Sequence, residues 1–262
     1  MMPAMSVRRA DRVVVVGALL GCSAMAWVAV VGLSAGSDMT MPSDMTMRMG
    51  TSMPNAELWS ADLALGIAAW TAMMTAMMLP ATVPMTTVFA ALTRRRLTPP
   101  ATARATAVFV AGYLTTWTGF SAAAALVQQL LASRGLLAND ALHAGLGGVV
   151  LVGAGVYQLG PAKRACLRRC RTPIGFLLAE WRDGVAGTAV MGVRHGLWCL
   201  GCCLPLMMVL FAVGVMNLAW MAVLAAVVMV EKTMSFGATA ARVAGAVLIG
   251  LGVWTLTPLM WR

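Results

Sequence analysis

Long apolar runs separated by short polar stretches make up most of the chain. A helix that crosses a bilayer needs about 20 mostly apolar residues, and seven segments meet this requirement. The pattern predicts an all-α fold, a polytopic transmembrane helix bundle of about seven spans. The expected spans are residues 13–33, 59–79, 105–131, 141–160, 196–215, 217–236 and 241–260.

The composition excludes the main alternatives to a membrane protein. Hydrophobic residues make up 60% of the 262 positions and charged residues only 11%, whereas soluble domains carry about 25% charged residues. Such a chain has too little polar surface for a soluble globule and is too apolar to stay disordered. Pro80 and Pro84, just after the second span, should end or bend its helix.

The basic residues indicate the orientation of the spans. There are nineteen lysines and arginines against nine acids, and they lie between apolar runs, which is typical of membrane topology. With a cytoplasmic N-terminus, sixteen of the nineteen fall on the inner side. We therefore expect the N-terminus inside and the C-terminus outside, in a bacterial inner membrane. The lipid bilayer is then a partner, and no nucleic acid is expected.

Two regions are expected along the chain. Residues 1–58 should hold the first transmembrane helix and a Met-rich outer loop, and residues 59–262 a six-helix membrane domain. The first apolar run is longer than the core of an ordinary signal peptide, so we expect a retained helix, with cleavage as the alternative.

The most specific motif is HGLWCLGCC, at residues 195–203. On a helix, His195 lies four residues before Cys199, and Cys202 and Cys203 follow Cys199 by three and four residues, which places the groups on one face. Thiolate and imidazole bind copper(I) and zinc. The expected topology puts the motif at the cytoplasmic entrance of the fifth span, where thiols stay reduced. The alternative is that these cysteines are small apolar packing groups.

Other candidate ligands lie on the same expected side. Cys166 and Cys170 are four residues apart among arginines that favour the thiolate form, and a joint site with the first motif is possible.

Glu231 is the only acid of the sixth span, where a charge is costly and usually has a role. It could bind a metal, support His195 or accept a proton. The alternative is a helix-end ion pair with Arg194 or Arg242. Pro205 leaves the carbonyl of Gly201 without its partner in the helix.

Methionines occur in two settings. An outer segment contains repeated Met-x-Met between Met39 and Met53, and thioethers suit copper(I) outside the cytoplasm; a flexible biased loop is the alternative. The second span carries a further stripe at helical spacing, for which ordinary packing is the favoured interpretation. That stripe consists of Met73, Met74, Met77 and Met78.

These motifs together resemble a known bacterial family, the predicted metal-binding integral membrane proteins catalogued as domain-of-unknown-function family 2182. The resemblance covers about residues 59–257, and its matching segments are MMTAMMLPATVPM (73–85), GYLTTW (112–117), YQLGPAKRACLRRCRTPIGF (157–176), and RHGLWCLGCC through GVMNLAWMAVLAAVVMVEK (194–232). The resemblance implies a metal site at Cys166, Cys170, His195, Cys199, Cys202, Cys203 and Glu231. The chain departs from the family pattern at Gly160, Leu204 and Pro205.

Three functions stay open on the sequence. The first is binding of a soft transition metal, copper(I) with zinc as the alternative, for handling, delivery or transport, with a membrane or periplasmic protein as a possible partner. The second is a membrane thiol-redox protein, and the third is an assembly subunit of a larger complex. No motif indicates a nucleotide site or a hydrolase triad, so a non-enzymatic role is favoured.

Overall fold

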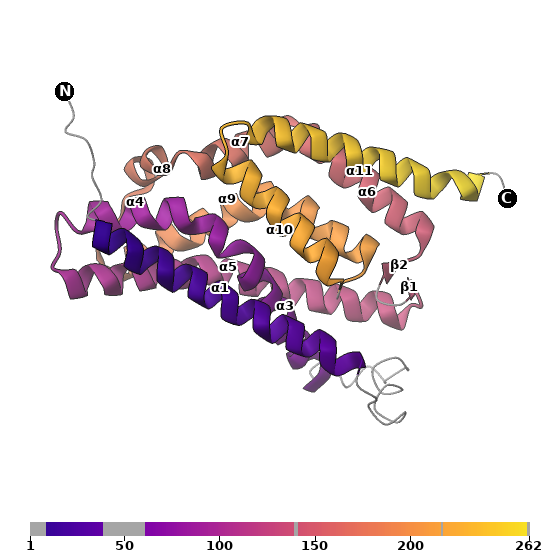
Figure 1. Cartoon of the computed structure of the whole chain (residues 1–262), viewed down its shortest axis with the longest axis horizontal. Coiled ribbons are helices and arrows are strands. Elements are labelled where there is room, and N and C mark those ends of the chain that lie inside the picture. The colour runs from indigo at the N-terminus through magenta and orange to yellow at the C-terminus, as the bar shows by residue number, and fades with distance from the viewer. Residues whose placement is uncertain (1–8, 39–60, 139–140, 216, 261–262) are drawn as a thin grey trace.

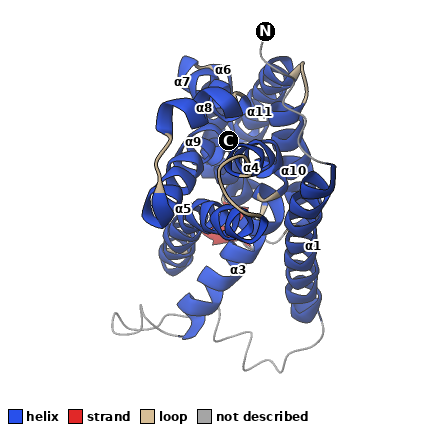
Figure 2. Ribbon diagram, turned by 90° about the vertical axis from the view of Figure 1, so that its left-hand side faces the viewer, coloured by secondary structure: helices blue, strands red, loops and turns tan. Residues whose placement is uncertain are grey.

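The chain forms a bundle of long helices in a computed structural model that describes residues 9–38, 61–138, 141–215 and 217–260 (Figure 1). The helices are α1 (Arg9–Asp38), α3 (Ala61–Met78), α4 (Val83–Thr93), α5 (Pro99–Ser133), α6 (Ala144–Leu159), α7 (Pro161–Arg171), α8 (Pro173–Glu180), α9 (Gly184–Val213), α10 (Leu218–Thr233) and α11 (Gly237–Met260). A 3-10 helix, η2 (Pro80–Thr82), joins α3 to α4. The strands β1 (Leu137–Ala138) and β2 (Ala141–Leu142) form a small antiparallel hairpin between α5 and α6 (Figure 2).

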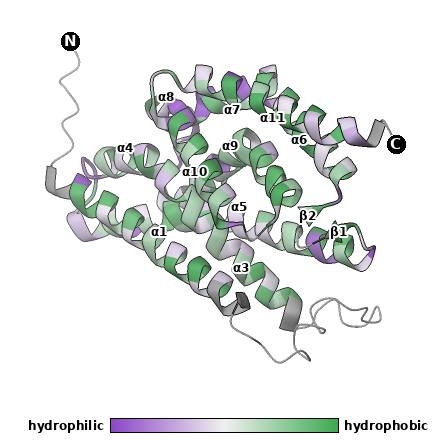
Figure 3. Ribbon diagram, turned by 45° about the vertical axis from the view of Figure 1, so that its right-hand side comes forward, coloured by the Kyte–Doolittle hydropathy of each residue, from purple (hydrophilic) through white to green (hydrophobic). Residues whose placement is uncertain are grey.

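The all-α prediction is confirmed for the described residues, and several long apolar helices are compatible with a membrane protein. Four helical segments are long and apolar enough to span a bilayer: Arg12–Ser34, Pro99–Ser133, Gly184–Val213 and Gly237–Pro258. Counting the two bent helix pairs as one span each gives six. At 16 residues, α10 is shorter than the usual span of about 20, so a seventh crossing and the orientation stay predictions. Hydrophobic colour covers most of the helices in Figure 3, and hydrophilic colour gathers around α7 and α8.

Two pairs of consecutive helices are bent where they join. The pair α3 and α4 bends by 43° at Pro80 and Pro84, as the sequence predicts, because proline cannot donate the backbone hydrogen bond that a continuous helix needs. The pair α6 and α7 bends by 62° at Gly160 and Pro161, a bend that the sequence analysis did not anticipate. This second bend turns α7 against α9.

Glycines let α5 and α9 approach closely. A Cβ atom added to Gly112 would lie 2.3 Å from the carbonyl oxygen of Ala189, and one added to Gly192 would lie 2.1 Å from that of Phe109. Only residues without a side chain allow backbones to come this near. This contact fixes α9, which carries the cysteine motif, firmly against α5.

The structure corrects the expected start of the fifth span. Helix α9 begins at Gly184, twelve residues before the predicted start at 196, because close packing on α5 continues the helix through Arg194. Arg194 itself pairs with Glu180 at the end of α8. Cys199 therefore lies fifteen residues after the start of α9 and fourteen before its end at Val213. The motif therefore lies near the middle of α9.

Candidate functional site

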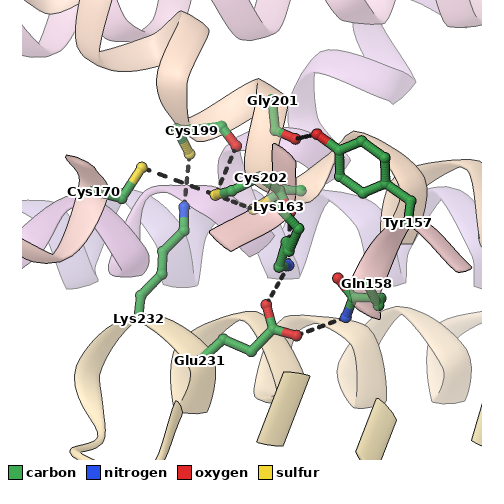
Figure 4. Close-up of polar contacts among 10 residues, drawn as sticks. Tyr157, Gln158, Lys163, Cys170, Cys199, Gly201, Cys202, Glu231 and Lys232 are labelled. Atoms are coloured by element: carbon green, nitrogen blue, oxygen red, sulfur yellow. Dashed lines mark hydrogen bonds and ion pairs between the residues drawn. The ribbon is translucent and has the colours of Figure 1, made fainter. Parts of the chain in front are cut away.

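The two cysteine motifs meet inside the bundle. Cys170 on α7 places its sulfur 3.9 Å from the Sγ of Cys202 on α9, and the sulfurs of Cys202 and Cys203 are 3.5 Å apart. The Sγ of Cys166 lies against α9 too, 3.1 Å from where a Cβ of Gly201 would stand. Segments about thirty residues apart in sequence thus bring their sulfurs together (Figure 4). We call Cys166, Cys170, Cys199, Cys202 and Cys203 the thiol cluster.

The amphipathic character of α7 explains how this helix docks. Lys163, Leu167 and Cys170 follow one another at spacings of four and three residues and are the buried residues of α7, so they share one face. The arginines lie on the exposed side of the helix, and the guanidinium of Arg169 stacks over the ring of Trp198 at 4.8 Å. The buried face of α7 therefore presents a thiol and an ammonium group to α9.

Cys199 has a different environment from the other thiols. Its Sγ accepts a hydrogen bond from Nζ of Lys232 at 2.7 Å and lies 3.2 Å from the hydroxyl of Tyr113. Figure 4 shows the Lys232 side chain rising from α10 toward this sulfur. An ammonium group beside a thiol stabilises the thiolate, the form that binds metals. Cys199 is therefore the sulfur whose negative charge the surroundings balance best.

Glu231 holds a buried ion pair beside the thiol cluster. Its carboxylate accepts from Nζ of Lys163 at 2.6 Å and from Nε2 of Gln158 at 2.7 Å, and the side chains of Glu231 and Lys163 are 1% and 0% exposed. Lys163 also donates to the carbonyl oxygen of Cys202 at 2.7 Å. Glu231 forms an ion pair, but its partner is Lys163 and neither Arg194 nor Arg242, the two that the alternative interpretation named. The ammonium group of Lys163 lies on α7. No pattern in the sequence indicates that α7 packs close to Glu231.

His195 lies in an aromatic cage instead of beside a carboxylate. Its ring centroid is 6.0 Å from that of Phe109, 5.5 Å from that of Tyr113 and 5.6 Å from that of Phe176. The side chain is buried, and its Nδ1 has no hydrogen-bond partner among the described residues. A buried polar atom without a partner is costly, so Nδ1 is available to accept a ligand.

Pro205 opens the helix where the sequence predicts. The carbonyl oxygen of Gly201, which proline deprives of its donor in the helix, accepts a hydrogen bond from the hydroxyl of Tyr157 at 2.7 Å. Figure 4 shows this contact at the edge of the polar network. A side chain from α6 thus replaces the missing backbone donor and ties α6 to the cysteine motif.

The methionine stripe of α3 packs in the same apolar core as four of the thiols. Met73, Met74, Met77 and Met78 are each no more than 3% exposed and belong to the cluster that includes Cys170, Cys199, Cys202 and Cys203. The hydroxyl of Tyr113 donates to the carbonyl oxygen of Met78 at 3.0 Å. One tyrosine thus connects the stripe to Cys199. The Met-rich segment from Met39 to Met53 lies outside the described residues.

The sulfurs of the thiol cluster are arranged in pairs, and one pair has a spacing at which both sulfurs could bind the same metal ion. Within the part of the chain that the structure describes, no three His, Cys, Asp or Glu side chains are arranged to hold one ion. Metal–sulfur bonds of about 2.3 Å place two sulfurs of one tetrahedral site about 3.8 Å apart, close to the 3.9 Å between Cys170 and Cys202. Soft donors and burial suit a soft ion, and the spacing is compatible with two sulfurs sharing one ion.

Four residues that contact the cysteine motif were not among the predicted site residues. Lys163 and Lys232 count as charges that orient the spans, and Tyr113 and Tyr157 as residues of the membrane interface. The structure places all four against the cysteine motif. The spacing of Lys163, Leu167 and Cys170 on one helical face is the signal that could have revealed Lys163.

Comparison with known proteins places the chain in a family. The family model PpoB2, described as copper chaperone, matches residues 67–255. The chain belongs to this copper chaperone family. The PpoB2 match supports a copper-related family, which agrees with the metal that the motifs predict, although it does not bear on the domain-of-unknown-function name. No match was found among curated proteins or among solved structures.

Proposed function

We propose that this PpoB2 family member is a membrane protein that binds copper(I) on the thiol cluster and hands it on. The observation that carries the proposal is the 3.9 Å contact between the sulfurs of Cys170 and Cys202. Two motifs from different helices converge there, and membership of a copper chaperone family names the ion. Copper(I) prefers soft sulfur ligands, and zinc is the alternative ion.

The proposal assigns a role to each predicted ligand. The thiol cluster receives the ion, and the unpartnered Nδ1 of His195 is a further donor. The methionines of α3 relay copper to it, and Met39–Met53 capture copper on the outer side. Glu231 supports the cluster through Lys163, because both of its carboxylate oxygens accept hydrogen bonds. A membrane or periplasmic protein would exchange copper with the chain.

We further propose that the chain crosses the bacterial inner membrane seven times, with its N-terminus on the inner side. Figure 1 shows α1 beginning and α11 ending at opposite ends of the bundle, as an odd number of crossings requires. Residues 1–58 would form an N-terminal unit beside the six-helix domain of residues 59–262. Reporter fusions placed after α1 and after α11 test this topology. The proposal expects both reporters on the outer side, and reporters active on opposite sides of the membrane would contradict it.

Copper binding is tested on the full chain purified in detergent. We expect the wild type to take up copper(I) under reducing conditions in competition with a chromogenic chelator. Cys170→Ser and Cys202→Ser should each weaken binding at least tenfold. Cys22→Ser is the matched control, because Cys22 is an exposed cysteine on α1. Equal copper binding by wild type and by a Cys170→Ser/Cys202→Ser double variant would refute the proposal.

A thiol-redox protein is the second candidate, favoured by the same pair of sulfurs. Cys170 and Cys202 are close enough that a small movement would allow a disulfide. Thiol trapping after mild oxidation distinguishes the two functions. A Cys170–Cys202 disulfide in a protein that binds no copper would favour redox chemistry. Stoichiometric co-purification of other subunits, with neither copper nor a disulfide, would favour the assembly role.

A further inference from the structure

The members of the thiol cluster differ in how far they are exposed. The three cysteines on α9 are each at most 1% exposed: Cys199, Cys202 and Cys203. On α7, Cys170 is 9% exposed, and Cys166 is half-buried. The Sγ of Cys166 nevertheless lies against Gly201 of the cysteine motif. Cys166 is therefore the member of the cluster that contacts α9 and also reaches the surface.

Cys166 lies at the edge of a positively charged side of α7. Arg169 follows it by three residues, so the two side chains lie on one side of the helix. The guanidinium of Arg169 is held over the ring of Trp198 at 4.8 Å. Arg164, Arg168 and Arg169 are exposed and form no ion pair with a carboxylate among the described residues. These arginines are free to pair with acidic groups of another molecule.

The exposed side of α7 suits an aqueous partner better than lipid. Its residues are Pro161, Ala162, Arg164, Ala165, Arg168 and Arg169, and hydrophilic colour marks this region in Figure 3. Helices that insert into the membrane interface carry large apolar residues opposite their basic ones. In α7 the side opposite the arginines is buried in the bundle, and large exposed apolar side chains resume only at Ile174 on α8. The arginines therefore favour an acidic protein surface, which complements their charge.

We infer that Cys166 is the sulfur through which copper(I) leaves the thiol cluster, and that the exposed side of α7 docks a partner protein with an acidic surface and a thiol ligand. This inference rests on the proposed copper function. Copper(I) passes from Cys170 to Cys166, one helical turn away, and then to the thiol of the partner protein. In each step one copper–sulfur bond forms as another breaks, and copper stays monovalent. The proton of the incoming thiol moves to the sulfur that is released.

Copper transfer from the full-length protein tests the inference. The protein is purified in detergent and loaded with copper(I). The acceptor is a synthetic peptide with two cysteines and several aspartates and glutamates, and a second peptide carries lysines in place of these acids. The transfer rate is expressed per bound copper, so that variants that bind different amounts of copper can be compared.

We expect Cys166→Ser to slow transfer to the acidic peptide at least tenfold, which corresponds to a barrier about 1.4 kcal/mol higher. Cys22→Ser, at an exposed cysteine on α1, is the control and should leave the rate unchanged. Transfer from Cys166→Ser at the wild-type rate would overturn the exit role of this sulfur.

The arginines are tested with two matched double variants. Arg168→Gln/Arg169→Gln should slow transfer to the acidic peptide about tenfold and abolish its advantage over the basic peptide. Arg95→Gln/Arg96→Gln also removes two exposed charges and one arginine that stacks on a tryptophan, and it should change the rate less than twofold. Equal effects of the two variants would overturn the docking surface. So would unchanged transfer in Arg168→Gln/Arg169→Gln if phosphatidylglycerol added to the detergent stabilises the wild type and not this variant, because the arginines would then bind lipid headgroups.

Alkylation of the metal-free wild type gives a readout that needs neither copper nor a variant. A maleimide should label Cys166 before Cys170 and before the three cysteines on α9, as mass spectrometry of the labelled peptides would show. Labelling of any other member of the thiol cluster first would overturn the inference alone. Absence of copper binding by the wild type would instead refute the proposed function, and the inference with it.

Discussion

The buried ion pair between Lys163 and Glu231 gives the most quantitative prediction. Lys163 comes from α7 and Glu231 from α10, and Lys163 also donates to the carbonyl of Cys202 on α9. One ammonium group therefore joins three helices around the thiol cluster. Glu231→Gln removes the negative charge and keeps the shape of the side chain. The ammonium of Lys163 is then left without its carboxylate in the interior.

The magnitude follows from burial and distance. At 2.6 Å and an effective dielectric constant of about 20, the Coulomb attraction is about 6 kcal/mol. Desolvation of the two ions offsets most or all of this gain, so the pair as a whole contributes little net stability. Removal of one partner has no such offset and typically costs about 3–5 kcal/mol. We expect Glu231→Gln to lower the melting temperature by on the order of 10 °C.

Thermal unfolding of the purified chain in detergent provides the assay. The double variant Lys163→Met/Glu231→Gln removes both charges and should recover most of the stability lost in Glu231→Gln. Additive losses in the double variant would refute the reasoning, because they would mean that the two side chains do not interact. A Glu231→Gln protein as stable as the wild type would refute it equally.

Three further predictions follow from other contacts. Tyr157→Phe removes the donor to the Gly201 carbonyl and should cost about 1–3 kcal/mol of unfolding free energy; Pro205→Ala should reduce that cost, as a double-mutant cycle would show. Gly192→Ala places a Cβ 2.1 Å from a backbone oxygen of α5 and should cost at least about 1–3 kcal/mol, whereas Gly17→Ala, which has open space around it, should have no effect in the same melting assay. Met77→Leu/Met78→Leu should change stability by less than about 1.5 kcal/mol per substitution while slowing copper uptake into reconstituted vesicles; unchanged uptake would remove these methionines from the relay.

The sequence predicted the features that depend on local composition. Apolar runs predicted the helices, because a segment without polar side chains has to bury its backbone polar groups in its own hydrogen bonds. Proline positions predicted the break after Met78 and the open carbonyl at Gly201. Cys166 and Cys170, four residues apart, both lie on helix α7.

The sequence could not predict the partners of buried charges. An ion pair of Glu231 with Arg194 or Arg242 was only the alternative interpretation, and Lys163 was not considered, because no local pattern indicates that a bend at Gly160 and Pro161 turns Lys163 inward. Lys232 looked like a charge at a helix end, and its contact with Cys199 exists only because α10 packs beside α9.

The amino-acid sequence alone therefore determined an all-α chain of long apolar helices with soft ligands in two motifs, because helix formation and ligand type are properties of short segments. The tertiary structure decided which sulfurs meet, which lysine is balanced by a carboxylate and which by a thiol. Those outcomes depend on bends between consecutive helices and on glycine contacts between distant helices, which no short segment of the chain determines.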